Sequence, residues 1–118
     1  MNYFYGNIEE QTLGNEDFRR VLHTSAHSQL VLMTLQAGEE IGLEIHADND
    51  QFFRLEEGQA EFVIDNDTFT AGADDAVVVP AGAQHNVINT GEGPLRLYTI
   101  YSPAHHPDGT VNHTKADA

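Results

Sequence analysis

Among the side chains of types that bind metal ions, four have a spacing that would bring them close together in space. Glu44 and His46 are two residues apart, so in a β-strand both side chains point to the same face. Gln51 follows after a three-residue turn, and an antiparallel return of the chain would bring it beside this pair. His85 stands at the start of a later strand, just after a Pro-x-Gly turn. If that strand lies opposite, all four side chains converge on one point.

Such a set of side chains favours one divalent transition metal ion. The sequence has no cysteine, so nitrogen and oxygen must hold any metal, and the set suits Mn, Fe, Ni or Zn. Glu44 gives the strongest reason to expect a metal ion, because a carboxylate that faces an apolar interior costs free energy unless it is paired or bound to metal. A purely structural role stays open as the alternative, with His46 and His85 as ordinary buried histidines and Gln51 as an amide bonded to the backbone.

Short β-strands are the elements that would carry these residues. Runs of β-type composition recur along the 118 residues, and turn residues separate most of them, which predicts one antiparallel β domain. Glu16–His23 would form a short turn or helix at most, and Asp65-Asn66 is a hairpin signal. We expect strands at Leu30–Leu35, Ile41–His46, Gln51–Glu56, Ala60–Asp65, Asp67–Ala71, Ala76–Val79, His85–Asn89 and Leu95–Tyr101.

The residues around the four candidates resemble the two motifs of the cupin superfamily. The first motif has a glycine, then His-x-His after five residues, Glu after four more and Gly after six more. The second has a glycine, then Pro-x-Gly after five residues, His after two more and Asn after three more. This chain keeps both spacings, with Gly38, Glu44-Ile45-His46, Gln51 and Gly58 in the first and Asp74, Pro80-Ala81-Gly82, His85 and Asn89 in the second. The likeness extends over about Leu30–Tyr101 and is nearest to small single-domain bacterial cupins, often labelled mannose-6-phosphate-isomerase-like.

The resemblance implies an all-β fold, a double-stranded β-helix barrel of the cupin, jelly-roll type. It would form a single domain over 1–118, with a barrel core at about 30–101 and an irregular C-terminal tail at 103–118. It also implies Glu44, His46, Gln51 and His85 as the metal ligands. Two of these depart from the family, because Glu44 replaces a ligand histidine and Gln51 a ligand glutamate. A carboxylate is gained at one position and lost at the other, so the charge of the shell is unchanged. Asp74 replaces a turn glycine, a minor change, since Asp suits turns.

Strand alternation and composition place several other side chains near the candidates. Phe53 and Leu55 share the inward face with Gln51 and are expected to wall the pocket, whereas Arg54 faces outward and is expected to pair with surface acids. Either Tyr98 or Tyr101 would reach the pocket. The remaining histidines are expected in loops or on the surface, although His105-His106 could cover the barrel mouth: His23, His27, His105, His106 and His113.

The acidic composition excludes some partners. Five basic and 19 acidic residues give a net charge of −14, which repels phosphate backbones and anionic lipids, so neither nucleic acid nor membrane is an expected partner. The N-terminus lacks the features of a secretion signal, which predicts a cytoplasmic location. We expect a homodimer, in which the aromatic segment Met1–Gly6 adds to a partner's sheet edge.

The residues and the resemblance together predict a mononuclear metal-dependent enzyme of the isomerase or dioxygenase type, acting on a small organic molecule of unknown identity. The metal would polarise the substrate or activate dioxygen or water at an open position, and Glu44 would act as a catalytic proton carrier if it leaves the metal. A phosphosugar isomerase is not favoured, because the chain has few basic residues. The alternative is a non-catalytic metal or small-ligand binding or regulatory module. An empty structural barrel would leave Glu44 unexplained.

Overall fold

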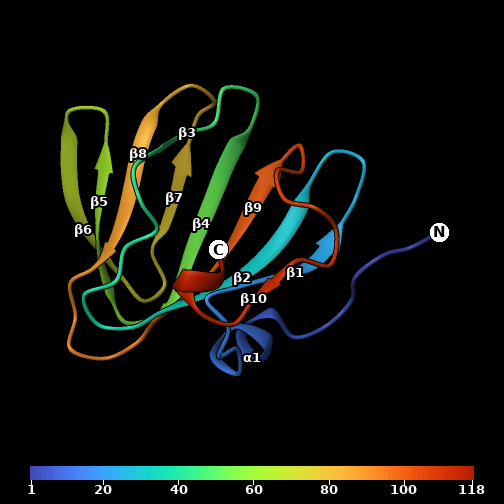
Figure 1. The fold of residues 1–118 in the computed structure, drawn as a ribbon, viewed down its shortest axis with the longest axis horizontal. Coiled ribbons are helices and arrows are strands. Elements are labelled where there is room, and N and C mark those ends of the chain that lie inside the picture. The colour runs from blue at the N-terminus through green and yellow to red at the C-terminus, as the bar shows by residue number, and fades with distance from the viewer.

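The fold, described for residues 1–118 by a computed structural model, is a sandwich of two antiparallel sheets (Figure 1). One sheet has six strands in the order β10-β1-β2-β9-β4-β7, and the other has four in the order β3-β8-β5-β6. The two sheets are not joined into one, so the all-β jelly roll is open at its edges rather than a closed barrel. The strands are β1 (Arg19–Thr24), β2 (Gln29–Leu35), β3 (Glu44–Ile45), β4 (Asp50–Glu57), β5 (Gln59–Ile64), β6 (Asp67–Gly72), β7 (Ala76–Val79), β8 (Gln84–Asn89), β9 (Leu95–Ser102) and β10 (Val111–Asn112).

The strands expected from the sequence are confirmed to within two residues, except at Ile41–His46. There the regular strand is only Glu44–Ile45, which pairs with β8. Gly42 interrupts the run with a φ of 114°, and its N–H turns to the side-chain oxygen of Asn86 at 2.9 Å. The prediction of one continuous strand was wrong because the glycine breaks the ladder between two points of contact with β8.

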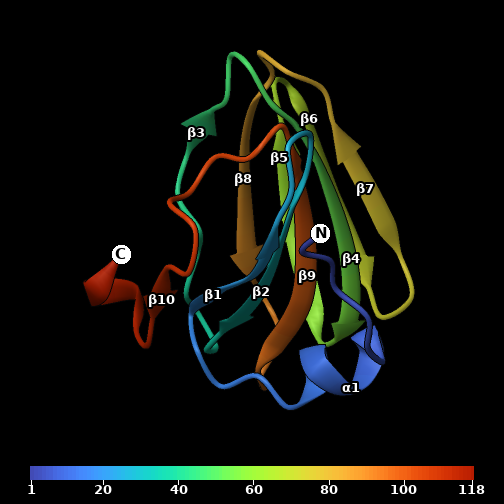
Figure 2. The same ribbon diagram turned by 90° about the vertical axis from the view of Figure 1, so that its right-hand side faces the viewer.

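The N-terminal region also corrects the sequence reading. Glu16–His23 was expected to form a turn or short helix, but Arg19–Thr24 is strand β1, paired with β2 and β10. The helix lies earlier, at α1 (Ile8–Leu13), where the side chain of Asn7 accepts the N–H of Glu10 at 3.0 Å. In Figure 2, α1 lies under the lower end of the six-stranded sheet, and it contacts β2, β4 and β9. Sheet pairing therefore outweighs the weak local preference of residues 19–23.

Three turns depend on the residues that occupy them. The predicted hairpin is confirmed: Ile64 pairs with Asp67, and Asp65 between them has a φ of 49°. At Gly58, whose φ is 94°, an added Cβ would lie 2.6 Å from the carbonyl oxygen of Pro94, so no larger residue fits. Asp74 adopts a φ of 73°, so the carboxylate residue takes the left-handed turn conformation that the glycine would have had.

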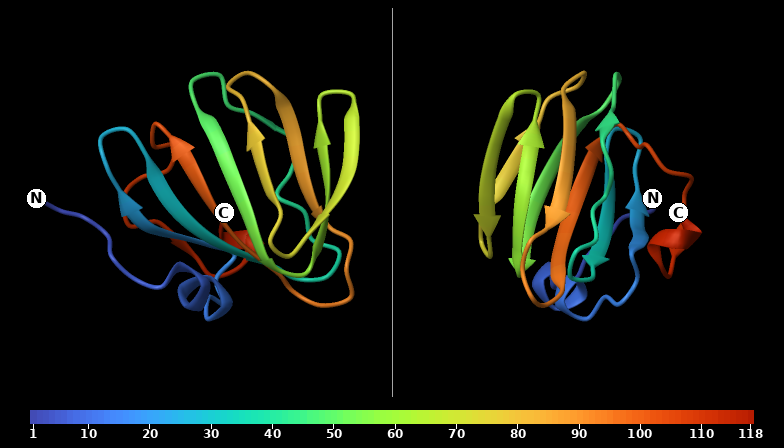
Figure 3. Two further views of the ribbon diagram at one scale, coloured as in Figure 1. Left: turned by 180° about the vertical axis from the view of Figure 1, so that it is seen from behind. Right: turned by 60° about the vertical axis from the view of Figure 1, so that its left-hand side comes forward.

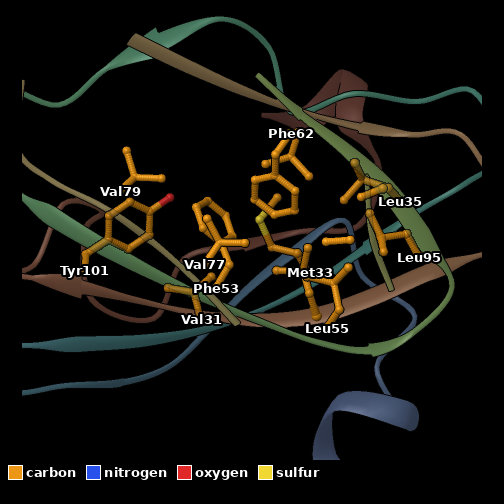
Figure 4. Packing of buried hydrophobic residues seen from close by; sticks show 14 of the residues in the cluster. Val31, Met33, Leu35, Phe53, Leu55, Phe62, Val77, Val79, Leu95 and Tyr101 are labelled. Atoms are coloured by element: carbon orange, nitrogen blue, oxygen red, sulfur yellow. The ribbon is translucent and has the colours of Figure 1, made fainter. Parts of the chain in front are cut away.

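The core fills most of the space between the sheets in successive rows of apolar side chains (Figure 4). Met33, Leu97 and Leu55 form one cross-strand row of the six-stranded sheet. Phe62 and Val87, paired in the opposite sheet, are also completely buried. The side chains of these rows are almost fully buried, as expected for a sandwich core.

The two termini differ in how they meet the sandwich. The N-terminal residues extend away from it (Figure 3), and Met1, Tyr3 and Tyr5 are exposed. The C-terminal residues return along the sheet, where β10 pairs with β1 and a 3-10 turn at Lys115–Asp117 ends the chain. Neither α1 nor this turn is long and apolar enough to cross a membrane.

Candidate metal centre

At one end of the sandwich interior, the inward-facing residues change from apolar to polar. Gln29, Tyr101 and Gln51 are cross-strand partners in one row of the six-stranded sheet. In the opposite sheet Glu44 pairs with His85. All but Glu44 are buried, so this polar row lies inside the molecule.

Glu44, His46 and His85 bring their donor atoms to within 4.8 Å of one another. Glu44 Oε2 lies 2.7 Å from His46 Nε2, and both histidines are buried, with 7% and 3% of their surface exposed. His46 follows directly after β3, and its carbonyl oxygen accepts the N–H of Gly82 at 2.9 Å. The Pro-x-Gly turn thereby joins the two motif segments and holds both histidines at the same end of the sandwich.

Hydrogen bonds determine which atom of Gln51 faces His85. The Thr99 hydroxyl donates to the Phe52 carbonyl at 2.8 Å, so its oxygen accepts from the Gln51 amide nitrogen at 3.0 Å. Gln51 Oε1 therefore faces His85 Nε2, at 3.2 Å. The Nδ1 of the same ring lies 3.1 Å from the Ala83 carbonyl, which can only accept, so Nδ1 carries a proton. In a neutral His85, Nε2 then carries a lone pair and no proton. Two hydrogen-bond acceptors, Nε2 and Gln51 Oε1, therefore face each other.

A cation between these two atoms would satisfy both acceptors. That cation is either a proton on His85 Nε2 or a metal ion bound by both atoms. Glu44 and His46 supply two further donors, which suits a metal ion better than a single proton. Two ligands at right angles, each about 2.1 Å from an ion, lie about 3.0 Å apart. The observed separations of 3.2 Å and 2.7 Å are close to this value, so the donor set fits one divalent ion.

Tyr101 and two tail histidines form the outer side of the polar row. Burial, with a further contribution from the charge of Glu44, raises the pKa of Tyr101 well above its usual range, so the phenol stays protonated. Its ring lies 5.6 Å from that of His46 and stacks on that of His105 at 5.3 Å. Burial and the nearby His46 lower the pKa of His105, and burial lowers the pKa of His106 to about 4. Both tail imidazoles are therefore neutral at pH 7.

The structure contains one cavity, of about 460 Å³, and it is not at this centre. It lies beside α1 and is lined by polar residues such as Glu10, Asn15 and Asp17, without a histidine. The polar row is the better candidate for the functional site, because buried donor atoms that converge define a metal site better than an open, acidic hollow does. The side chains of Tyr101 and His105 fill the space above His46 instead.

The structure brings together all four residues that the sequence singled out, and it settles several neighbouring positions. Phe53 and Leu55 are inward and completely buried, as predicted. Of the two tyrosines left open, Tyr101 reaches the site, and Tyr98 packs against Phe52 on the other face. Arg54 pairs with Glu56 at 3.2 Å and with Asp74 at 2.9 Å, which confirms its predicted outward role.

Gln29 and Thr99 were missed by the sequence reasoning. Gln29 is completely buried and bonds the tail, and Thr99 orients Gln51. A signal for Thr99 existed, because Leu95, Leu97, Thr99 and Tyr101 are spaced two apart in one strand and so share one face. Gln29 begins a strand, where alternation alone could not tell an inward amide from an exposed one.

Comparison with known proteins agrees with this fold and its motifs. A family model described as "Cupin domain" matches residues 31–101. The uncharacterized protein YrkC of Bacillus subtilis is 50% identical over 121 residues, which cover 98% of this chain and 65% of that protein. The uncharacterized protein L612 of Acanthamoeba polyphaga mimivirus is 47% identical over 112 residues, which cover 90% of this chain and 69% of that protein. The chain thus spans about two thirds of the length of these relatives.

Solved structures extend the likeness to three dimensions. The crystal structure of BH2720 from Bacillus halodurans superposes with a TM-score of 0.96 at 47% identity, covering 98% of this chain and 92% of that one. A predicted oxalate decarboxylase from Thermotoga maritima superposes with a TM-score of 0.62 at 21% identity, covering 64% of this chain and 66% of that one. The second likeness concerns the fold alone.

Proposed function

Because the chain belongs to the cupin domain family, we propose that it binds one divalent transition metal ion and acts as a metal-dependent enzyme on a small organic molecule. Glu44, His46, Gln51 and His85 would hold the ion, which would be Mn, Fe, Ni or Zn, because the donors are nitrogen and oxygen. The reaction would be of the isomerase or dioxygenase type.

The observation that carries the proposal is the pair of facing acceptors, Gln51 Oε1 and His85 Nε2, 3.2 Å apart in a buried site. Backbone carbonyls hold the outer ends of both side chains, through Thr99 for Gln51 and directly for His85. Neither side chain can therefore reverse its polarity without losing a hydrogen bond. A cation there would satisfy both acceptors, and Glu44 and His46 supply two further donors, which suits a metal ion better than a proton.

The residues around the ion would divide the work of a reaction. The ion would act as a Lewis acid toward an oxygen atom of the substrate. Glu44 is the half-buried, solvent-facing member of the group and would serve as a proton carrier when it leaves the metal. Tyr101 stays protonated and can donate a hydrogen bond from its hydroxyl. Phe53, behind Gln51, keeps water away from the inner side of the site.

A second candidate function is a non-catalytic module that binds a metal ion or a small ligand. The surroundings of His46 favour it, because the rings of Tyr101 and His105 occupy the space beside this histidine where a substrate would approach. Turnover separates the two functions. A panel of sugars, keto acids and catechol-like compounds, followed by product analysis and oxygen uptake, should show consumption only if the protein is an enzyme.

The metal site itself is tested by elemental analysis of protein purified without added metal. We expect close to one divalent ion per chain in the parent, and loss of tight binding in His46→Ala and His85→Ala, because each removes one of two imidazole ligands. The fold should persist in both variants, since the apolar rows specify it. His27→Ala, which changes an exposed loop histidine, is the matched control and should bind like the parent.

Circular dichroism would show whether each variant keeps the fold. If the parent holds no ion and takes up none, the cation beside Gln51 is the proton on His85, and the metal site is wrong. If both histidine variants retain stoichiometric metal, the ion lies elsewhere in the chain.

A further inference from the structure

The residues that follow β9 cross the mouth of the metal centre, and we call Pro103–His106 the strap. Figure 2 shows the chain leaving β9 and running across the end of the sandwich, past β3, toward β10. The buried amide of Gln29 holds the strap on both sides. Its oxygen accepts the N–H groups of His105 and His106 at 3.1 and 3.0 Å, and its nitrogen donates to the His106 carbonyl at 2.7 Å.

A second buried amide holds the start of the strap. Asn49 Nδ2 donates to the Pro103 carbonyl at 2.5 Å and to the Ala104 carbonyl at 3.4 Å. Beyond the strap, residues 107–109 are exposed, and the chain is then tied to the sheet by the pairing of β10 with β1. No residue of the strap belongs to the apolar core. The strap is thus held by a few polar contacts, the kind of segment that opens locally without global unfolding.

His105 is the strap residue that lies against the metal centre. Its ring meets the ring of His46 edge-on, with 4.2 Å between the centroids, and stacks on Tyr101. His105 is an exposed residue, so its ring has the site on one side and solvent on the other. It is not one of the three residues whose donor atoms converge within 4.8 Å, so it stands in front of the centre without completing it.

We propose that the strap is the gate of the metal centre, and that the His105 ring controls whether an ion or a small molecule can reach His46. The proposal rests on the metal site of the proposed function and adds a residue that governs access to it. With His105 in place its ring covers His46, so access to His46 from this side requires the strap to leave its two amide anchors.

The test measures rates of metal exchange in the full chain, with Co²⁺ as the probe. Stopped-flow absorbance follows Co²⁺ uptake by metal-free protein, and a chelator follows its release. His105→Ala removes the ring, and Asn49→Ala loosens the anchor while His105 stays. His27→Ala is the matched control, an exposed histidine on the loop between β1 and β2.

We expect both strap variants to speed uptake and release together, by about tenfold, because an opening step costing about 1.4 kcal/mol would be removed in both directions. The dissociation constant for Co²⁺ should then stay close to that of the parent, and His27→Ala should change neither rate. Unchanged rates in both strap variants would overturn the gate. So would faster release with unchanged uptake and an altered Co²⁺ spectrum in His105→Ala, which would make His105 a ligand.

A measurement without metal keeps the gate testable if no ion binds. Diethyl pyrocarbonate modifies accessible imidazoles, and mass spectrometry locates the modified histidines. In the metal-free protein we expect His46 to react slowly in the parent and several times faster in Asn49→Ala. If the parent binds no Co²⁺ but this difference appears, the proposed function fails and the gate stands. If His46 reacts equally fast in both proteins, the gate fails whether or not metal binds.

Discussion

The two ends of the sandwich interior are built by the same strands but have opposite chemistry. Along β9 the inward residues pass from Leu95 and Leu97 to Thr99 and Tyr101. Figure 4 shows this direction, with Leu35 and Leu95 at one end of the buried cluster and Tyr101 at the other. One end is an apolar core, and the other is a polar row that carries the candidate metal ligands and lies beneath the strap.

The comparison indicates how stability and chemistry are divided within one small domain. Each apolar side chain buried at the first end contributes about 1.5–3 kcal/mol. At the second end, buried polar groups contribute little net stability even when they are satisfied, and they cost stability when a partner is missing. The polar row is therefore tolerable only because the apolar rows stabilise the strands that carry it.

The largest expected effect is a loss of stability caused by a substitution in the apolar core. Phe62 is completely buried and packs edge-on against Phe53, with 5.3 Å between the ring centroids. Phe62→Ala should lower the free energy of unfolding by about 3–5 kcal/mol, because it leaves a cavity between the two sheets. Denaturant unfolding of the metal-free protein measures the loss. Under native conditions the variant should still bind metal with parental affinity.

Phe69→Ala is the matched control for this prediction. Phe69 stacks on Phe62 at 5.6 Å but is 39% exposed, so its loss should cost about 1 kcal/mol. If Phe62→Ala weakened metal binding as strongly as a change in the polar row does, the two ends would not be separable in the way proposed.

Much of this division could be predicted from the sequence. The two-residue alternation identified the side chains of β4 that face inward, including Gln51 and Phe53. The spacing of the two motifs predicted that His46 and His85 lie close together. These inferences depend on local geometry, which a strand carries in its own residues. The jelly-roll fold followed from the resemblance to cupins, and the family match agrees with it.

The remainder depends on contacts between distant residues, which local patterns do not encode. The role of Gln29 as an anchor appears only when residues 105 and 106 lie beside it, 76 and 77 positions later in the chain. Strand β1 forms because β2 offers a partner, although its own residues were read as a turn or helix. The helix at Ile8–Leu13 had a local signal in the Asn7 cap, which was overlooked.

An intermediate effect is expected from the exchanged charges of the polar row. Glu44 carries the single carboxylate among the four candidate ligands, so Glu44→Gln leaves four neutral donors around a charge of +2. Affinity for a divalent ion should fall about 10- to 100-fold, equivalent to about 1.4–2.8 kcal/mol, as measured by competition with a chelator. The unfolding free energy of the metal-free protein should change far less than in Phe62→Ala.

Two further variants show whether charge is what matters at these positions. Gln51→Glu adds a second carboxylate and should tighten binding, while Glu44→His combined with Gln51→Glu recreates the common cupin shell and should bind about as well as the parent. Parental affinity in Glu44→Gln would mean that Glu44 is not a ligand. It would then serve as the hydrogen-bond partner of His46, 2.7 Å away.

The smallest expected effect concerns the cover of the polar end and depends on pH. Burial, and then the charge of Arg19, lower the pKa of His106 to about 4 in the folded protein, whereas a histidine in an unfolded chain titrates near 6.5. Between these values the unfolded chain binds a proton that the folded protein does not. The contribution of neutral His106 is therefore fully present above about pH 6.5 and is lost as the pH falls toward 4.

Comparison of His106→Asn with the parent isolates this contribution among seven histidines. Unfolding of the metal-free proteins at pH 7.5 and pH 5 should show a smaller loss of stability in the variant, by no more than about 1 kcal/mol, because solvent screens the partly exposed ring. His27→Asn, which changes an exposed loop histidine, should behave like the parent. An equal loss in parent and His106→Asn would show that the strap holds its histidine as loosely as an unfolded chain does. The polar end would then be open to solvent even with the strap in place. The two ends of the interior would differ in solvent access as well as in polarity.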